Sequence, residues 1–309
     1  MTIERRTFLG GALALGASAC VPVERTVLGR LDARLRIIEA AGNGTLGAEL
    51  YDTGTGQSLG INQDRRFGHC SSFKLSLAAM VLARHASGTA DADSRVTWGE
   101  DDLMFVSPFT TTRLGDGATL RELAEATQKY SDNAAANVLL RELGGPPALT
   151  AFWRSVGDEI SRLDRIEPAL NNVPVTETRD TTTPAAMART VAALTFGDVL
   201  PETERALLRQ WMIDTPTGAN RVRAGLPEKW IAGDKTGTSI WPGMGSLYVD
   251  IGFVQPPSKE DKPRAPLTFA TYFRARETHD GIDPEAEATL AKIGDVIADF
   301  AEEDDGFPF

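Results

Sequence analysis

Residues 71–85 read SSFKLSLAAMVLARH, a mostly apolar stretch for which we predict a buried helix. Ser71 and Lys74 lie three positions apart, so a helix places both side chains on one face. An ammonium group beside a serine hydroxyl stabilises developing alkoxide charge, and a neutral lysine can take the proton. Taken alone, the pair is a weak signal, and a helix N-cap followed by a surface lysine is the more common explanation.

Further helices are predicted on both sides of this stretch. Thr119 and Glu122 have the spacing of a capping box, which opens a helix. Gly144 follows an apolar-periodic segment and closes it. The other helices predicted in the middle of the chain cover residues 132–143, 183–194 and 202–213. The middle of the chain is therefore expected to be helical.

Strands are predicted near both ends of the chain, where turn residues bound runs of β-branched and aromatic residues. They cover residues 46–52, 57–62, 230–233, 246–254 and 267–275, and helices are predicted at 27–41 and 283–300. This order predicts an α/β domain assembled from both chain ends, residues 27–65 and 215–309. An all-α domain, residues 66–214, is inserted between the two parts.

Two polar motifs fall outside the long helices. Ser131-Asp132-Asn133 precedes a helix, so its short side chains either cap that helix or reach into a cleft, and Asp132 can do the first while its neighbours do the second. Lys235-Thr236-Gly237-Thr238 is expected at the end of a strand, where glycine allows a ligand to approach the backbone. Lys235 there places a positive charge beside a substrate carboxylate.

A third motif, Glu167-Pro-Ala-Leu-Asn171, lies in a segment with little regular structure. Arg165 and Asp180 bracket it and are placed to pair across its base, which predicts a compact Ω-loop. A carboxylate held in such a loop can act as a general base on water. The alternative is a surface turn with a local ion pair, worth at most about 1 kcal/mol.

Together the four motifs occur in the order Ser-x-x-Lys, Ser-Asp-Asn, Glu-x-x-Leu-Asn and Lys-Thr-Gly, and in this the sequence resembles the class A β-lactamases. The stretches at residues 162–171 and 221–227 resemble the family as well, and the resemblance covers almost everything after residue 26. It implies an antiparallel sheet flanked by helices, with the all-α domain inserted. It also implies hydrolysis of the β-lactam amide of penicillins and cephalosporins, and hence antibiotic resistance.

The resemblance assigns catalytic roles to individual residues. Ser71 matches the nucleophile and Lys74 the lysine that helps to activate it. Ser131 matches the hydroxyl that passes a proton to the departing lactam nitrogen. Glu167 and Asn171 match the pair that holds and activates the hydrolytic water. Either Glu167 or Lys74 serves as the base for acylation, whereas Glu167 is expected to be the base for deacylation.

Substrate-binding roles follow from the same resemblance. Lys235 and Thr236 match the residues that meet the substrate carboxylate, and Asn133 matches the one that hydrogen-bonds the substrate's side-chain amide. The backbone N–H groups of Ser71 and Thr238 match the oxyanion hole. The Thr238 hydroxyl is further expected to favour cephalosporins. Arg221 looks like the extra arginine that supports carboxylate binding in some members, the alternative being a surface arginine.

Cys70 departs from one pattern in the family. It resembles the cysteine that, in carbapenem-hydrolysing members, bonds to a cysteine just after the Lys-Thr-Gly strand. Ser239 occupies that partner position here, so no such disulfide is expected. Cys70 is therefore predicted to be a buried, unreactive small residue.

Two rival functions share most of these residues. A penicillin-binding D,D-peptidase would have the same Ser71, Lys74 and Lys235, but its acyl-enzyme with a β-lactam would persist. A β-lactam sensor domain also acylates and stalls, and such domains are normally joined to a membrane helix. Glu167 with Asn171 favours the hydrolase over both.

Composition narrows the possible partners. The formal charge is -11, and an acidic protein repels nucleic-acid phosphates and anionic membranes. The histidines His69, His85 and His279 form no zinc-binding pattern, so no metal or cofactor is expected. We expect small β-lactam substrates as the only partners, and a monomer.

Residues 1–26 resemble an export signal. Arg5 and Arg6 precede an uncharged stretch that is too short to span a membrane, as in a Tat signal or an ordinary signal peptide. Cys20 follows Ala17-Ser18-Ala19, which resembles a lipoprotein cleavage site, although simple cleavage near residues 21–25 is the alternative. The protein is therefore expected in the periplasm or outside the cell, free or lipid-anchored.

Overall fold

The computed structural model describes residues 26–258 and 263–303, so the predicted signal segment and Cys20 lie outside the described residues. Its centre is a five-stranded sheet in the order β2-β1-β9-β8-β7, and every neighbouring pair is antiparallel. The strands are β1 (Gly44–Asp52), β2 (Ser58–Ile61), β7 (Ile231–Ser239), β8 (Leu247–Gln255) and β9 (Leu267–Ala275). The predicted α/β fold with an antiparallel sheet from both chain ends is confirmed.

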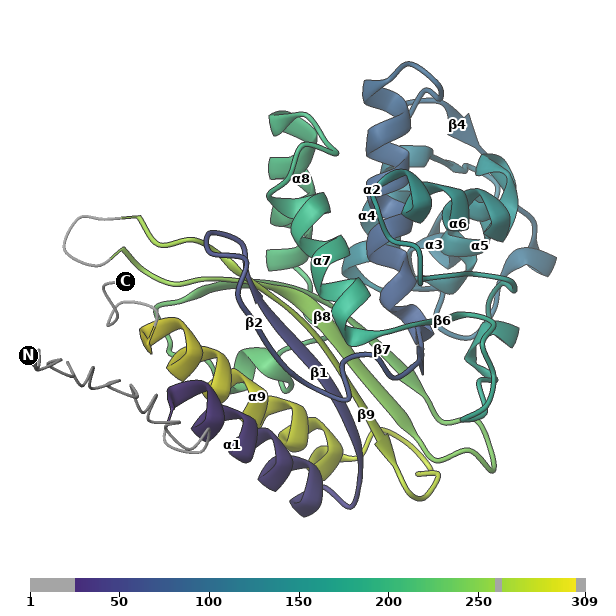
Figure 1. The fold of residues 1–309 in the computed structure, drawn as a ribbon. Coiled ribbons are helices and arrows are strands. Elements are labelled where there is room, and N and C mark those ends of the chain that lie inside the picture. Colours follow the sequence, from purple (N-terminus) through teal and green to yellow (C-terminus); the bar gives the residue numbers. More distant parts are fainter. Residues whose placement is uncertain (1–25, 259–262, 304–309) are drawn as a thin grey trace, which may run out of the picture.

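Two terminal helices cover one face of this sheet. α1 (Val27–Ala41) and α9 (Pro284–Glu303) lie side by side against it (Figure 1). The side chains of Leu31, Leu35 and Ile38 recur at helical spacing along α1 and are buried there. The Thr26 hydroxyl accepts a hydrogen bond from the Gly29 N–H, which satisfies one free donor of the first turn of α1.

The other face of the sheet meets the helical part of the chain (Figure 1). Its helices are α2 (Phe73–Ala86), α3 (Pro108–Thr112), α4 (Leu120–Lys129), α5 (Asn133–Leu143), α6 (Gly145–Ser155), α7 (Pro184–Thr195) and α8 (Glu202–Ile213). α7 packs directly on β1 and β9, and α8 on β7. One hydrophobic core fills this side and a second lies under α1 and α9. The domain limits at residues 65/66 and 214/215 stay a prediction.

The predicted helix caps are present. Thr119 and Glu122 form the capping box of α4, and the Asp132 carboxylate accepts the Ala135 N–H at the start of α5. Gly144 has a left-handed backbone, φ 98°, and both ends α5 and precedes α6. We did not predict α6. Two prolines follow Gly145 at the start of this helix. They stand in its first turn, where the missing N–H groups cost nothing.

Two element boundaries were predicted wrongly. A 3₁₀ turn, Cys70–Ser72, precedes α2, so the α-helix begins at Phe73 rather than at residue 71. β7 runs to Ser239 rather than ending at 233. Its middle is polar, and burial of those residues depends on partners from other elements, such as the 2.5 Å ion pair of Asp234 with Arg223. A pattern of apolar residues cannot show such partners.

Candidate active site

The turn that carries Ser71 is wedged between α2 and β7. Cys70 has a positive φ of 47°, a backbone conformation that non-glycine residues rarely adopt. β7 passes so close that a Cβ on Gly237 would lie 2.8 Å from the Cβ of Cys70 and 2.9 Å from the Ser71 nitrogen. Gly237 is thus required for the strand to pack against the turn. The ligand approach expected at this glycine stays a prediction. This contact places the backbone of β7 beside the Ser71 hydroxyl.

Ser71, Lys74 and Glu167 meet at this turn. Lys74 Nζ lies 2.9 Å from Ser71 Oγ and 3.2 Å from Glu167 Oε1, and Ser71 Oγ lies 3.4 Å from the same carboxylate oxygen. The side chains of Lys74 and Glu167 are 0% and 1% exposed. Burial lowers the pKa of Lys74, and the neighbouring Glu167 carboxylate opposes that shift. Two groups able to accept a proton therefore lie within reach of one hydroxyl.

Ser131 lies between two lysines. Its hydroxyl is 3.1 Å from Lys235 Nζ and 3.4 Å from Lys74 Nζ, and its φ is 57°. Lys74 also donates to the Ser131 carbonyl at 2.9 Å and to the Asn133 side-chain oxygen. Burial, followed by repulsion from Lys74, lowers the pKa of Lys235 well below its usual range. The Ser131 hydroxyl is thus placed to receive or pass a proton inside the site.

Glu167 and Asn171 form a pair on the segment between α6 and α7. Asn171 Nδ2 donates to Glu167 Oε2 at 2.7 Å, and the Glu167–Pro168 peptide is cis. Asn137 of α5, which we did not single out, holds the Glu167 backbone from both sides. Its side chain accepts from the Glu167 N–H at 3.0 Å and donates to the Glu167 carbonyl at 2.9 Å. Asn137 stands four residues after Asn133, on the same helix face, and this spacing was the available signal.

The base of this segment is closed as predicted. Arg165 Nε lies 2.5 Å from Asp180 Oδ2, and the Asp180 side chain is fully buried. The other Asp180 oxygen accepts the N–H groups of Asp164 and Arg165 at 2.7 and 2.9 Å. Because the pair is buried and hydrogen-bonded, it is more than the exposed local ion pair that we considered as the alternative.

The far end of β7 carries the predicted substrate-binding hydroxyls. Thr236 Oγ1 is 2.7 Å from the hydroxyl of Thr217, a residue that sequence reasoning missed. Arg221 is 2% exposed, which excludes the surface arginine, and its Nη2 donates to Thr238 Oγ1 at 2.7 Å. Its Nε pairs with Glu287 at 3.0 Å. The structure therefore brings the residues assigned from the sequence together along β7. They stand on β7 itself, on α2 and its preceding turn, at the start of α5, and on the segments that carry Glu167 and Arg221.

Comparison with known proteins agrees with this geometry. The model described as "Beta-lactamase enzyme family" matches residues 30–301. The chain belongs to this family. It is 39% identical to the β-lactamase AST-1 of Nocardia asteroides over 96% of each chain. It is 41% identical to OXY-2 of Klebsiella oxytoca over 84% of this chain and 87% of that one.

Comparison with a solved structure shows which class of β-lactamase the chain resembles. An ancestral class A β-lactamase superposes with a TM-score of 0.81 and 44% identity, over 87% of this chain and 99% of that one. The expected resemblance to class A is therefore confirmed. Across the described residues, none of the helices of this class A β-lactamase combines the length and apolar content needed to cross a membrane.

Cys70 of this β-lactamase is buried and free, as predicted. Burial raises the pKa of its thiol to about 12, so the unreactive thiol form dominates at neutral pH. Ser239, which takes the place of a second cysteine, donates instead to the Asn171 carbonyl at 2.9 Å. A hydrogen bond thus links β7 to the Glu167 segment at the position where a disulfide was considered.

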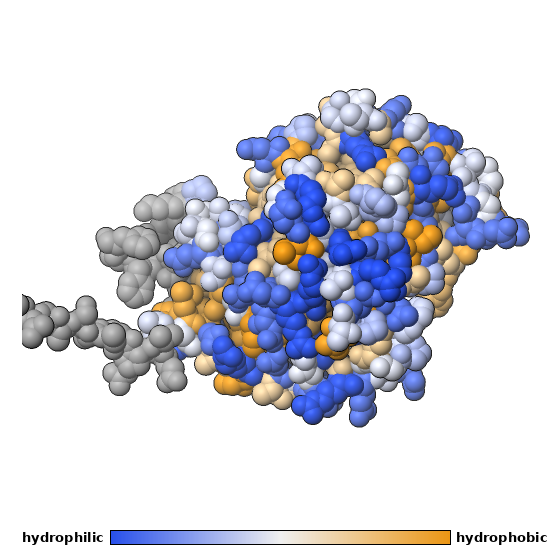
Figure 2. Space-filling model, turned by 45° about the vertical axis from the view of Figure 1, so that its right-hand side comes forward, coloured by the Kyte–Doolittle hydropathy of each residue, from blue (hydrophilic) through white to orange (hydrophobic). Residues whose placement is uncertain are grey.

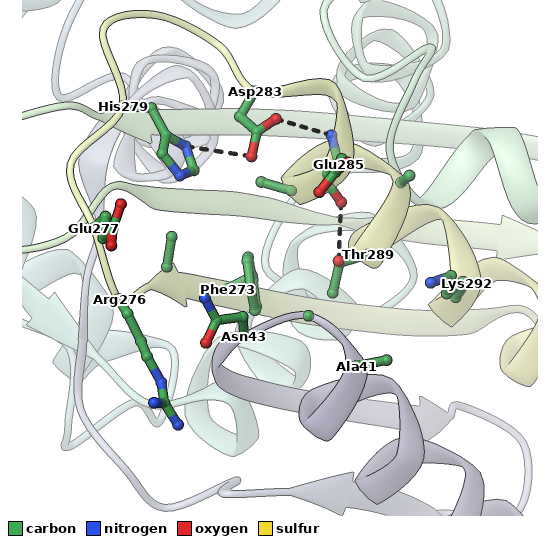
Figure 3. A pocket seen from close by; sticks show the side chains of 14 residues that line it. Ala41, Asn43, Phe273, Arg276, Glu277, His279, Asp283, Glu285, Thr289 and Lys292 are labelled. Carbon is green, nitrogen blue, oxygen red and sulfur yellow. Dashed lines mark hydrogen bonds and ion pairs between the residues drawn. The ribbon is translucent and has the colours of Figure 1, made fainter.

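Two of the three histidines have structural roles within the fold. His69 is fully buried and stacks on Trp153 with ring centroids 4.8 Å apart. Burial lowers the pKa of His69 to about 4, so the ring is neutral at pH 7. His279 lines a cavity of about 310 Å³ beside α9, with Asp283 close to it (Figure 3). None of the residues assigned to the site lines this cavity.

His85 belongs to a polar group on the surface. Its ligand atoms and those of Asp91 and Asp93 lie within 4.8 Å of one another. The Ala92 N–H already donates to His85 Nδ1 at 3.2 Å, and Arg121 pairs with Asp93 at 2.8 Å. Those contacts occupy the lone pair of His85 Nδ1 and part of the Asp93 carboxylate. On the face of the molecule that Figure 2 displays, hydrophilic residues predominate and apolar residues form small separate patches.

Proposed function

We propose that this class A β-lactamase hydrolyses the β-lactam amide of penicillins and cephalosporins through an ester on Ser71, and so confers antibiotic resistance. The observation that carries the mechanism is the convergence on Ser71 Oγ of Lys74 Nζ at 2.9 Å and of Glu167 Oε1 at 3.4 Å. A serine becomes an effective nucleophile when a group beside it can take its proton. Both candidates for that base are within reach.

Acylation begins with attack of Ser71 Oγ on the lactam carbonyl carbon. The hydroxyl proton passes to Glu167 or Lys74, and the carbonyl oxygen becomes an oxyanion facing the backbone N–H groups of Ser71 and Thr238. One such donor is typically worth about 3 kcal/mol in rate. The C–N bond then breaks, and the lactam nitrogen takes the proton of Ser131 Oγ. The Lys74 ammonium, 3.4 Å from Ser131 Oγ, can replace this proton. Where Glu167 took the Ser71 proton, it passes that proton to Lys74 Nζ at 3.2 Å, so its carboxylate is free again for deacylation.

Deacylation needs a water molecule aligned on the ester carbonyl. The carboxylate of Glu167 and the side chain of Asn171, joined at 2.7 Å, form the site for that water. Glu167 takes one proton from the water while the oxygen attacks the ester carbon. The ester C–O bond breaks, and Ser71 Oγ regains a proton. The product is the ring-opened acid, and the enzyme returns to its starting state.

Substrate orientation depends on the far end of the site. Lys235, Thr236 and Thr238 bind the substrate carboxylate, and Arg221 supports it through its hydrogen bond to Thr238 Oγ1. The cationic and hydroxyl donors at this end are suited to an anionic group. Asn133 hydrogen-bonds the amide of the substrate side chain.

The rival functions differ in the fate of the acyl-enzyme, so turnover separates them. The purified protein is mixed with a chromogenic cephalosporin in large excess. Many turnovers per enzyme are expected for the hydrolase. A single burst equal to the enzyme concentration would instead identify a D,D-peptidase or a sensor, in which Ser71 acylates but water attack fails.

We also infer that the enzyme is exported and acts as a monomer. Residues 1–26 have the features of an export signal, and every residue of the proposed site comes from one chain. Cell fractionation and size-exclusion chromatography test the two inferences. Activity confined to the cytoplasm would contradict export, and a mass near twice 33.2 kDa would contradict the monomer.

A further inference from the structure

Three successive carbonyl groups at the end of the Glu167 segment each accept a side-chain hydrogen bond from a different part of the molecule. Ser239 of β7 donates to the Asn171 carbonyl at 2.9 Å, and Arg165 donates to the Asn172 carbonyl at 2.9 Å. Arg274 of β9 donates to the Val173 carbonyl at 3.0 Å. Side chains thus help to fix residues 171–173, of which only Asn171 belongs to a regular element, the 3₁₀ turn Ala169–Asn171.

Arg274 differs from the other two donors because it connects two loops. Its Nη2 reaches Val173 and its Nη1 reaches the Met244 carbonyl, in the connection between β7 and β8, at 3.0 Å. Within the described residues no carboxylate lies at ion-pair distance from the Arg274 guanidinium. Burial lowers the pKa of Arg274, which shows that the charged side chain has lost part of its water. A half-buried cation needs hydrogen-bond acceptors to offset the loss of water. The two carbonyl groups supply them, so the side chain is held between the loops.

Two further hydrogen bonds connect the Arg274–Val173 contact to Glu167, the general base. The Val173 N–H donates to the Asn171 carbonyl at 3.2 Å, and the Asn171 side chain donates to Glu167 Oε2 at 2.7 Å. A shift of Val173 away from the sheet therefore moves the residue that holds both Glu167 and the water. Ser71 and Lys74 are fixed separately, on α2 and the turn before it.

We propose that Arg274 is a positioning residue for deacylation, which holds the Glu167–Asn171 pair in register with Ser71 by tying Val173 to β9 and to the β7–β8 connection. The proposal rests on the hydrolytic function proposed above. It concerns the second half of the reaction, because Lys74 is available as the base for acylation and neither Ser71 nor Lys74 has a hydrogen bond to Arg274.

Kinetics distinguish this role from a general structural one. In an acyl-enzyme pathway kcat/KM reports the steps up to acylation, whereas a slower deacylation lowers kcat and KM by the same factor. For Arg274→Ala we expect kcat and KM to fall together by about 10-fold, the equivalent of one lost hydrogen bond to a charged group, with kcat/KM nearly unchanged. Mass spectrometry during turnover should show more of the enzyme as the acyl adduct.

Two further variants make the test specific. Arg276→Ala removes an exposed arginine two residues along and should leave all parameters unchanged. Arg274→Lys keeps the charge but loses the forked geometry, so it should show the same joint fall, only smaller, and it serves if Arg274→Ala does not fold.

The outcomes separate the two proposals. A lower kcat with unchanged KM in the arginine variants, or no change at all while the wild-type enzyme turns over, would overturn the role of Arg274 alone. A wild-type enzyme that stops after one burst would overturn the hydrolytic function, and the role of Arg274 with it.

Discussion

The two halves of the proposed reaction depend on regions that are built differently. Ser71 and Lys74 stand on α2 and its preceding turn, where ten successive residues from Phe73 to Leu82 are buried. Glu167 and Asn171 lie on a segment whose regular structure is limited to a short 3₁₀ turn, Ala169–Asn171. Packing holds the first region, and a few polar contacts hold the second. Damage to the second should therefore affect deacylation most, because Lys74 remains beside Ser71 for acylation.

Removal of the general base gives the largest contrast between the two regions. Glu167→Ala should lower kcat by about 10²–10⁴-fold, the usual contribution of a positioned acid or base. Acylation should continue, at least slowly, because Lys74 remains 2.9 Å from Ser71 Oγ. Mass spectrometry after mixing with a penicillin should show the trapped adduct.

Glu177→Ala provides the matched control for this experiment. Glu177 lies in the same segment but pairs with Arg179 at 2.5 Å, away from the site. Its loss should leave turnover near the wild-type rate. A folded Glu167→Ala enzyme that forms no adduct would show that the assigned division of roles is wrong.

The ion pair at the base of the segment tests whether polar contacts hold this region. Asp180→Ala leaves Arg165 and two backbone N–H groups without their acceptor. Loss of one partner of a buried pair typically costs about 3–5 kcal/mol, and we expect the lower figure because Arg165 is 20% exposed. Urea unfolding measures the change. A loss below about 1 kcal/mol would mean that the pair behaves as an exposed one.

Lys235 tests the region of substrate binding. Lys235→Ala should raise KM by roughly 10–100-fold, because a hydrogen bond to a charged group is typically worth about 1.5–3 kcal/mol. Steady-state kinetics with a penicillin measure this, and Lys235→Arg should recover part of the loss by keeping the charge. A fall in kcat at constant KM would instead assign Lys235 to proton transfer through Ser131, whose hydroxyl is 3.1 Å away.

The contrast between a region held by packing and a region held by polar contacts also explains which features could be predicted from the sequence. Periodicity and caps predicted helices such as α1 and α8 with their observed bounds, because these signals are local. The motif residues were also found, since the motifs are short and ordered along the chain. Asn137, Thr217 and Arg274 were missed. Their importance comes from contacts with Glu167, Thr236 and Val173, which are distant in sequence. Only Asn137 had a local signal, its spacing of four residues from Asn133.

The smallest expected effect concerns the Thr238 hydroxyl, at the end of β7. It accepts a hydrogen bond from Arg221 at 2.7 Å and can turn its own proton toward a substrate carboxylate. Because we expect this contact to favour cephalosporins, Thr238→Ala should lower kcat/KM several-fold for a cephalosporin and less for a penicillin. A hydrogen bond of about 1 kcal/mol corresponds to such a factor.

Thr238→Ser is the control, because it keeps the hydroxyl and loses only a methyl group. Its ratio of cephalosporin to penicillin kcat/KM should match that of the wild-type enzyme. An equal loss on both substrates in Thr238→Ala would show that the hydroxyl only holds Arg221 in place. In that case Arg221→Ala should give the same equal loss, and the preference between substrates would have to arise elsewhere in the site.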